Sequence, residues 1–212
     1  IKRVLAAIGL ASISYGGSAD DSLCELVEGN YLQDPIFEQR NSGQTLEYWV
    51  SSQHAGEKSY ELGFNNGELS ITKIGTQPWF YFRQVVAAQE LAGKKLALNA
   101  ELKLDMPESR RASAGGGIKI VARSSSLQGR KLLLRSTLDH QPHNGKTDWF
   151  PVQVVVDLPD KTDTVEIGFI HQSEGTVQVR NPSLQLVDES TVPCTVSPNA
   201  VQGIKRVPVG LR

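Results

Sequence analysis

Hydrophobic and polar residues alternate almost without exception over residues 95–104. Leucine or alanine occupies every even position from 96 to 104, and lysine, asparagine and glutamate fill most of the odd positions. This period of two predicts a β-strand, because successive side chains of a strand point to opposite faces of the sheet. The same alternation predicts further strands over residues 118–120, 132–135, 152–156, 165–169 and 177–180.

Residues that favour turns separate these segments, including Asn65-Asn66-Gly67, Asn144-Gly145, Pro159-Asp160 and Ser173-Glu174-Gly175. Between Leu23 and Val187 no window of about twelve residues keeps a helical period. Short strands with one polar face each favour an all-β fold, a two-sheet antiparallel β-sandwich over residues 23–189. The alternation ends after Asp188, so we expect residues 190–212 to form a C-terminal tail.

The first nineteen residues have the three parts of a secretory signal. Lys2 and Arg3 precede an apolar run of about ten residues, and small residues follow up to Ala19. The run is too short to span a bilayer, which takes about 20 residues, and no other stretch qualifies. Residues 1–19 are therefore a candidate signal peptide, and we expect a secreted or periplasmic protein. The alternative is a retained, ordered N-terminal segment.

Charge and composition exclude several classes of protein. The chain has 22 Lys and Arg against 23 Asp and Glu, a net charge of −1, so no bulk electrostatic attraction to nucleic acid or an anionic membrane is expected. Two cysteines in 212 residues exclude a disulfide-dense miniprotein and a zinc site built mainly from cysteine.

Signatures of catalysis are missing from the sequence. It contains neither Gly-x-Ser-x-Gly nor His-Glu-x-x-His. The segment Gly145-Lys146-Thr147 ends like a phosphate-binding loop, but His140 stands where the leading glycine is required. Asp139, His140, His143 and Asp148 could ligate a transition metal, but a polar loop is the favoured interpretation, because no fixed strand or helix spacing directs the imidazoles toward one point. We expect no catalytic residues and a protein that is not an enzyme.

The order of several motifs resembles the galactose-binding-like jelly-roll family. Residues 30–38 open with Asn30 and end in Phe37-Glu38, and Trp49 follows a variable loop. An aromatic strand over residues 79–86, a strand led by Trp149 and a closing strand over residues 177–184 complete the pattern. Members of this family include carbohydrate-binding modules of secreted glycosidases and many interaction domains, so the fold alone does not name the function.

In this family, paired aspartates on the closing strand and the glutamate of Phe-Glu usually hold a structural calcium ion. Here Arg180 and Asn181 stand at the aspartate positions, and Glu38 is the remaining carboxylate. Calcium prefers six to eight oxygen ligands, so this departure from the family's pattern argues against a calcium ion, and we expect no metal and no cofactor. Arg180 is then expected to pair with Glu38.

Candidate ligand-binding residues come from aromatic, amide and guanidinium side chains, which suit the apolar face and the hydroxyls of a sugar. Trp79, Tyr81 and Arg83 share one side of a strand because side chains alternate. Arg123, Gln153 and His171 are expected to face the same groove. Trp49 and Trp149 are expected in the core. Alternatively, Trp79 and Tyr81 cover the sandwich surface or a partner interface.

These observations favour a non-catalytic binding domain, with carbohydrate recognition on a sandwich face as the leading hypothesis. The alternative is a structural or assembly subunit that contacts protein partners, or copies of itself, through this face and its terminal segments. The two cysteines, Cys24 and Cys194, flank the strand-rich body. The first and last strands of a jelly roll commonly lie side by side, so we predict a disulfide between these two cysteines.

Overall fold

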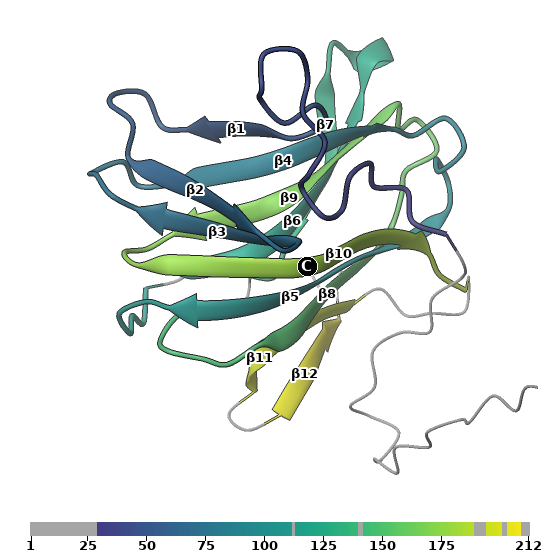
Figure 1. The fold of residues 1–212 in the computed structure, drawn as a ribbon. Helices are drawn as coiled ribbons and strands as arrows, with labels where there is room; N and C mark the ends of the chain where they lie inside the picture. The colour runs from purple at the N-terminus through teal and green to yellow at the C-terminus, as the bar shows by residue number, and fades with distance from the viewer. Residues whose placement is uncertain (1–28, 112, 140–141, 189–193, 201–202, 209–212) are drawn as a thin grey trace, which may run out of the picture.

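The computed structural model describes residues 29–111, 113–139, 142–188, 194–200 and 203–208 (Figure 1). The candidate signal peptide and Cys24 therefore lie outside the described residues. Two antiparallel β-sheets face each other and enclose the core, which confirms the predicted β-sandwich. Within the described residues, no helix has the length and the apolar composition needed to cross a membrane.

The five-stranded sheet has the order β1-β4-β9-β6-β7. These strands are β1 (Val50–Gln53), β4 (Phe80–Ala87), β9 (Thr164–Gln172), β6 (Gly115–Ser124) and β7 (Arg130–Ser136). A single 3₁₀ turn, η1 (Ser125–Leu127), connects β6 to β7.

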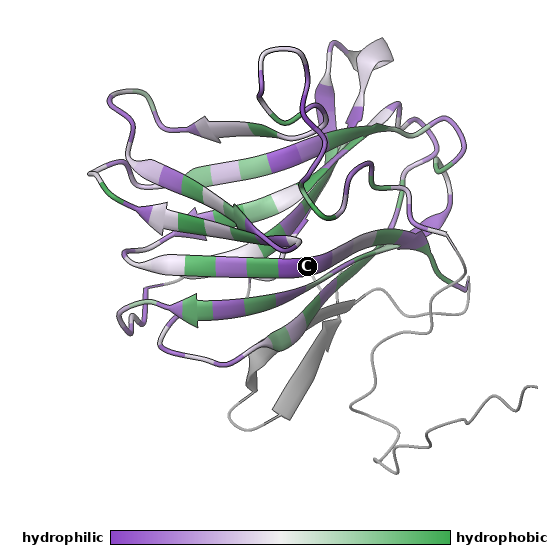
Figure 2. Ribbon diagram, viewed as in Figure 1, coloured by the Kyte–Doolittle hydropathy of each residue, from purple (hydrophilic) through white to green (hydrophobic). Residues whose placement is uncertain are grey.

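The seven-stranded sheet has the order β12-β11-β8-β5-β10-β3-β2. Its strands are β12 (Gly203–Pro208), β11 (Cys194–Ala200), β8 (Phe150–Asp157), β5 (Lys95–Asp105), β10 (Thr176–Leu186), β3 (Glu68–Lys73) and β2 (Tyr60–Asn65). Figure 2 shows the alternation of hydrophobic and hydrophilic residues along β5 and β10 that the sequence pattern predicts.

Aromatic rings fill the middle of the core. Trp49 is 3% exposed and stacks on Phe82 and on Phe169, with ring centroids 5.4 and 5.6 Å apart. Its indole Nε1 donates a hydrogen bond to the Asp34 carbonyl oxygen at 2.9 Å. This confirms the predicted core position of Trp49 and fixes the segment before β1 to the sandwich.

Trp149, in contrast, is not a core residue. It is half-buried, and the guanidinium carbon of Arg180 lies 4.3 Å from its ring centroid. Trp149 directly precedes β8 and lies two positions before Pro151, so the two side chains point to the same side. Pro151 pairs with Glu101 on the outer face of the seven-stranded sheet. The prediction that places Trp149 in the core is wrong, because this parity turns the side chain outward.

The C-terminal segment differs from the predicted tail. β11 pairs with β8 through Thr195 and Val196, and β12 forms the edge of the sheet. Proline removes a backbone donor, so Pro198 and Pro208 argue against strands in the sequence. In the structure Pro198 lies where the pairing of β11 with β12 shifts register, and Pro208 ends the edge strand. Both positions tolerate proline.

Candidate functional site

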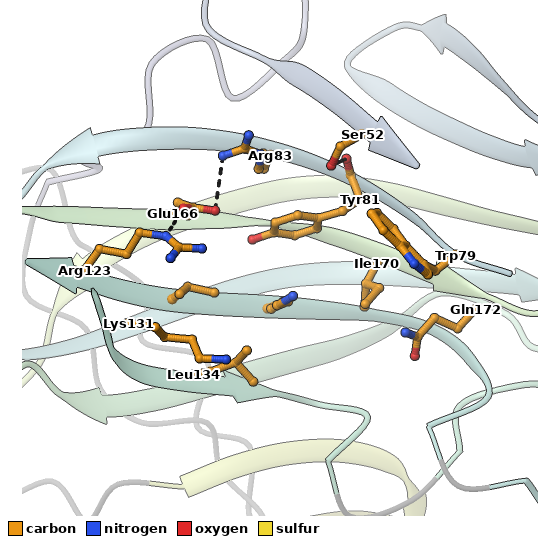
Figure 3. Close-up of a pocket in the computed structure, with 12 residues that line it drawn as sticks. Ser52, Trp79, Tyr81, Arg83, Arg123, Lys131, Leu134, Glu166, Ile170 and Gln172 are labelled. Carbon is orange, nitrogen blue, oxygen red and sulfur yellow. Dashed lines mark hydrogen bonds and ion pairs between the residues drawn. The ribbon is translucent and has the colours of Figure 1, made fainter. Parts of the chain in front are cut away.

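A pocket of about 480 Å³ lies on the outer face of the five-stranded sheet (Figure 3). We call it the groove and define it by the residues that line it: Ser52, Trp79, Tyr81, Arg83, Lys119, Val121, Arg123, Lys131, Leu134, Glu166, Ile170 and Gln172.

Strand register brings these side chains together. In β4 the even residues Phe80 and Phe82 enter the core, so Tyr81 and Arg83 face outward. Tyr81 lies opposite Ile170 of β9, and Arg83 lies opposite Gly168. Gly168 in turn pairs with Lys119 of β6. Gly168, which has no side chain, therefore lies between Arg83 and Lys119 in this row.

One end of the groove is aromatic. Trp79 packs against a small buried cluster of Tyr81, Leu138 and Ile170. Tyr81 is 6% exposed, and the Lys119 ammonium lies 4.6 Å above its ring centroid. The Tyr81 hydroxyl is buried and forms no hydrogen bond with any described residue. Burial, and secondarily the Glu166 carboxylate, raises the pKa of this phenol, so it stays neutral.

The other end is cationic and is organised by one carboxylate. Glu166 Oε2 lies 3.1 Å from Arg83 Nη1, and Glu166 Oε1 accepts a hydrogen bond from Arg123 Nε. Figure 3 shows Glu166 between the two arginines, with Trp79 at the opposite end of the groove. A carboxylate that bridges two guanidinium groups holds both side chains in place.

Two lysines add to this charge. Burial lowers the pKa of Lys119, and the nearby Glu166 carboxylate partly offsets that effect. Lys131 is exposed. Within the described residues neither lysine forms an ion pair, in contrast to the two arginines.

The groove contains four of the six predicted ligand-binding residues: Trp79, Tyr81, Arg83 and Arg123. Whether they contact a ligand stays a prediction. Sequence reasoning missed the other charged residues, Lys119, Lys131 and Glu166. The parity signal was present for two of them, since Lys119 lies between Ile118 and Ile120 and Glu166 between Val165 and Ile167.

Gln153 and His171 do not reach the groove, which corrects the prediction for both. Gln153 lies in β8 of the other sheet, is 0% exposed and donates a hydrogen bond to Asn99 Oδ1 at 2.7 Å. His171 does lie in β9, but it has the parity of Phe169 and points into the core at 0% exposure. Its Nε2 donates to the Gly175 carbonyl oxygen at 3.0 Å, and its ring meets Tyr60 edge-on.

Residues considered for metal binding have other roles. Arg180 does not pair with Glu38, which is exposed. Instead, Arg180 Nε donates a hydrogen bond to Glu101 Oε2 at 2.6 Å. Among the described residues, no group of three or more His, Cys, Asp or Glu is arranged to hold a metal ion. His143 is buried, and His140 lies outside the described residues.

Comparison with known proteins shows similarity in structure but not in sequence. No protein-family model matches the chain, and no curated protein does. A xylan-binding domain of carbohydrate-binding module family 22 superposes over 75% of this chain and 96% of its own, at 11% identity and a TM-score of 0.51. The CBM22-1 xylan-binding domain of Paenibacillus barcinonensis Xyn10C does so over 78% and 99%, at 10% identity and 0.50.

The enzymatically active domain of tailspike protein 4 from bacteriophage CBA120 has a TM-score of 0.54 at 15% identity. The match covers 74% of this chain and 21% of the tailspike chain, so this chain spans about a fifth of that protein. Identities this low establish the fold alone. The chain has the antiparallel β-sandwich jelly-roll fold that carbohydrate-binding modules adopt.

Proposed function

We propose that this chain is a non-catalytic carbohydrate-binding domain and that the groove holds the glycan. The main observation in support is that two aromatic side chains line the same pocket as guanidinium and amide groups: Trp79 and Tyr81 with Arg83, Arg123 and Gln172. A sugar ring has apolar C–H faces that stack on aromatic rings, and hydroxyls that need directional donors and acceptors. The groove offers both kinds of contact within one open surface.

The fold supports this function. By their names, two solved structures that share the fold are xylan-binding domains. A fold does not identify a ligand, so the assignment rests on the groove itself. Its rigid base favours binding, because the lining residues other than Trp79 project from paired strands, and Trp79 directly precedes β4. Secretion or periplasmic export remains part of the proposal and rests on the signal pattern of residues 1–19.

Substitution of Trp79 tests the proposal. We expect Trp79→Ala to abolish retention on a panel of immobilised polysaccharides that retains the parent protein, because the stacking face is lost. The melting temperature should fall by only a few degrees, since the side chain is half-buried.

Trp149→Ala is the matched control. Trp149 is also half-buried and contacts a cation, but it lies on the other sheet. Equal loss of retention in both variants would contradict the assignment of the groove. Absence of retention of the parent protein on every polysaccharide would instead favour the structural or assembly subunit.

A further inference from the structure

The groove concentrates positive charge, although the net charge of the whole chain is close to zero. Four cationic side chains line it, Arg83, Lys119, Arg123 and Lys131, against the single carboxylate of Glu166. Three positive charges are therefore in excess there, although the whole chain carries −1. Asp139 acts electrostatically on Lys119, but it does not line the groove, and its Oδ2 accepts the Ser136 N–H.

The contacts inside the groove leave most of its donors available. A guanidinium has five N–H donors. Within the described residues, the Arg83 guanidinium forms an ion pair with Glu166 and no other hydrogen bond or ion pair, and Arg123 adds to its Glu166 pair only a hydrogen bond at 3.4 Å to the Gly129 carbonyl oxygen. Lys119 has the face of the Tyr81 ring as its partner, and Lys131 of β7 pairs in register with Arg123 of β6. The cationic end thus presents donors without acceptors.

A neutral sugar does not need such a surface. Amide and carboxylate groups are sufficient to form hydrogen bonds with sugar hydroxyls. Clustered cations, in contrast, repel each other unless an anion lies between them. Glu166 performs this role for the two arginines through direct ion pairs. Neither lysine forms an ion pair with a described carboxylate, and Glu166 and Asp139 act on Lys119 only through longer-range electrostatic attraction. Fixed cations beside an aromatic stacking face suit a ligand with both a sugar ring and an anionic group.

We propose that the groove binds an acidic polysaccharide, a sugar chain that carries carboxylate or sulfate groups. A ring of the chain stacks on Trp79, and an anionic substituent lies between Lys119 and Lys131 at the cationic end. This inference rests on the proposed carbohydrate-binding function and adds the chemical class of the ligand.

Pairs of probes that differ only in charge provide the test. De-esterified and fully methyl-esterified homogalacturonan share one backbone with and without carboxylates, and dextran sulfate and dextran do the same for sulfate. Isothermal titration of the full chain should show binding to at least one charged probe and affinity at least about tenfold weaker for its neutral counterpart. The affinity should fall as salt is raised, because exposed charges are screened.

Lys119→Gln/Lys131→Gln should weaken binding of the charged probe by about tenfold or more. Its matched control is Lys94→Gln/Lys161→Gln, which removes the same charge from two exposed lysines outside the groove and should leave affinity unchanged. Lys131→Gln alone, at an exposed position, keeps the test valid if loss of Lys119 disturbs folding.

The outcomes are distinguishable. Equal affinity for charged and neutral probes overturns the acidic ligand but leaves the carbohydrate-binding function intact. Binding of an oligonucleotide of equal charge, as tightly as the acidic polysaccharide, also overturns it, because the groove would then recognise charge without sugar. If the protein binds none of the four polysaccharides and none of the immobilised polysaccharides of the panel, both proposals are refuted.

Discussion

At the residue scale, the buried polar groups are the most informative. Tyr60 and Tyr81 are both buried tyrosines, at 2% and 6% exposure, yet they differ in their hydroxyls. The Tyr60 hydroxyl donates to the Gln77 carbonyl oxygen at 3.0 Å, whereas the Tyr81 hydroxyl has no partner among the described residues. A buried polar group without a partner costs about 1–3 kcal/mol, so the base of the groove is less stable than it could be.

Tyr81→Phe should therefore leave the free energy of unfolding unchanged or raise it by about 1 kcal/mol, because it removes an unpartnered hydroxyl. Tyr60→Phe, the matched control, should lower it by about 1 kcal/mol, because it breaks a hydrogen bond. Urea unfolding of the two variants and the parent protein makes the comparison. A larger loss in Tyr81→Phe than in Tyr60→Phe would mean that the Tyr81 hydroxyl has a bonded partner.

Two buried histidines predict a dependence of stability on pH. Burial lowers the pKa of His143 and of His171 from 6.5 to about 4, although a backbone hydrogen bond partly offsets the effect in each. Between about pH 6.5 and pH 4 the unfolded chain then binds protons that the folded chain does not. Stability should fall as pH falls through this window, by up to about 2 kcal/mol for each histidine at pH 5.

The contribution of His171 can be isolated with His171→Gln, which keeps a side-chain N–H that can reach the Gly175 carbonyl oxygen but does not titrate. Denaturant unfolding at pH 7.5 and pH 5 should show a smaller loss of stability on acidification in this variant. An unchanged loss would indicate that His171 is protonated in the folded protein at pH 5.

At the element scale, the middle three strands of the five-stranded sheet decide the shape of the groove. β4, β9 and β6 align Arg83, Gly168 and Lys119 in one transverse row. A Cβ atom on Gly168 would lie 2.1 Å from the Phe82 carbonyl oxygen and 2.7 Å from the Arg83 Cα. Glycine is therefore needed for β4 and β9 to approach this closely.

Gly168→Ala should destabilise the protein by about 3 kcal/mol, because the added methyl group overlaps backbone atoms that cannot move without breaking the ladder. Gly43→Ala is the control, since a Cβ there meets only the Asn41 side-chain oxygen at 3.3 Å in an exposed loop. Midpoints of chemical unfolding give the difference. A loss below about 1 kcal/mol for Gly168→Ala would show that the two strands can separate without cost.

At the scale of the whole molecule, described segments from the early and the late part of the sequence lie against the same sheet. The Tyr31 N–H donates to the Leu184 carbonyl oxygen at 2.8 Å, so the described chain at Tyr31 lies beside β10. Cys194 begins β11, which joins the sheet through β8. β5 lies between β8 and β10 and is paired with both. The seven-stranded sheet thus gathers segments from both ends of the sequence.

The disulfide between Cys24 and Cys194 stays a prediction at this scale, because Cys24 lies outside the described residues. A bond that closes a loop of about 170 residues would stabilise the chain by up to about 5 kcal/mol on the chain-entropy model. Mass spectrometry of the non-reduced protein should show a mass two hydrogens below that of the reduced chain. Two free thiols in fresh material would contradict both the bond and the argument for export.

The sequence by itself determined strands β4 to β10 and the sides on which most of their residues lie, because the period of two is a local property of an extended chain. It placed Trp79, Tyr81 and Arg83 on one side of a strand, and the groove contains all three. The parity of His171 with Phe169 also indicated a core position, although the aromatic and polar character of the side chain favoured a binding role. Periodicity therefore outweighed residue chemistry at this position.

Tertiary structure alone decided which strands are neighbours, since pairing joins segments far apart in the chain and leaves no local pattern. The Gln153 side chain does point to the other side of its strand from Val152 and Val154, as alternation requires. However, β8 belongs to the seven-stranded sheet and not to the sheet that carries the groove. The meeting of Lys119, Arg123 and Glu166 depends likewise on the register of β6 with β9. A chain of nearly zero net charge acquires a cationic groove because long-range strand pairing places those residues side by side.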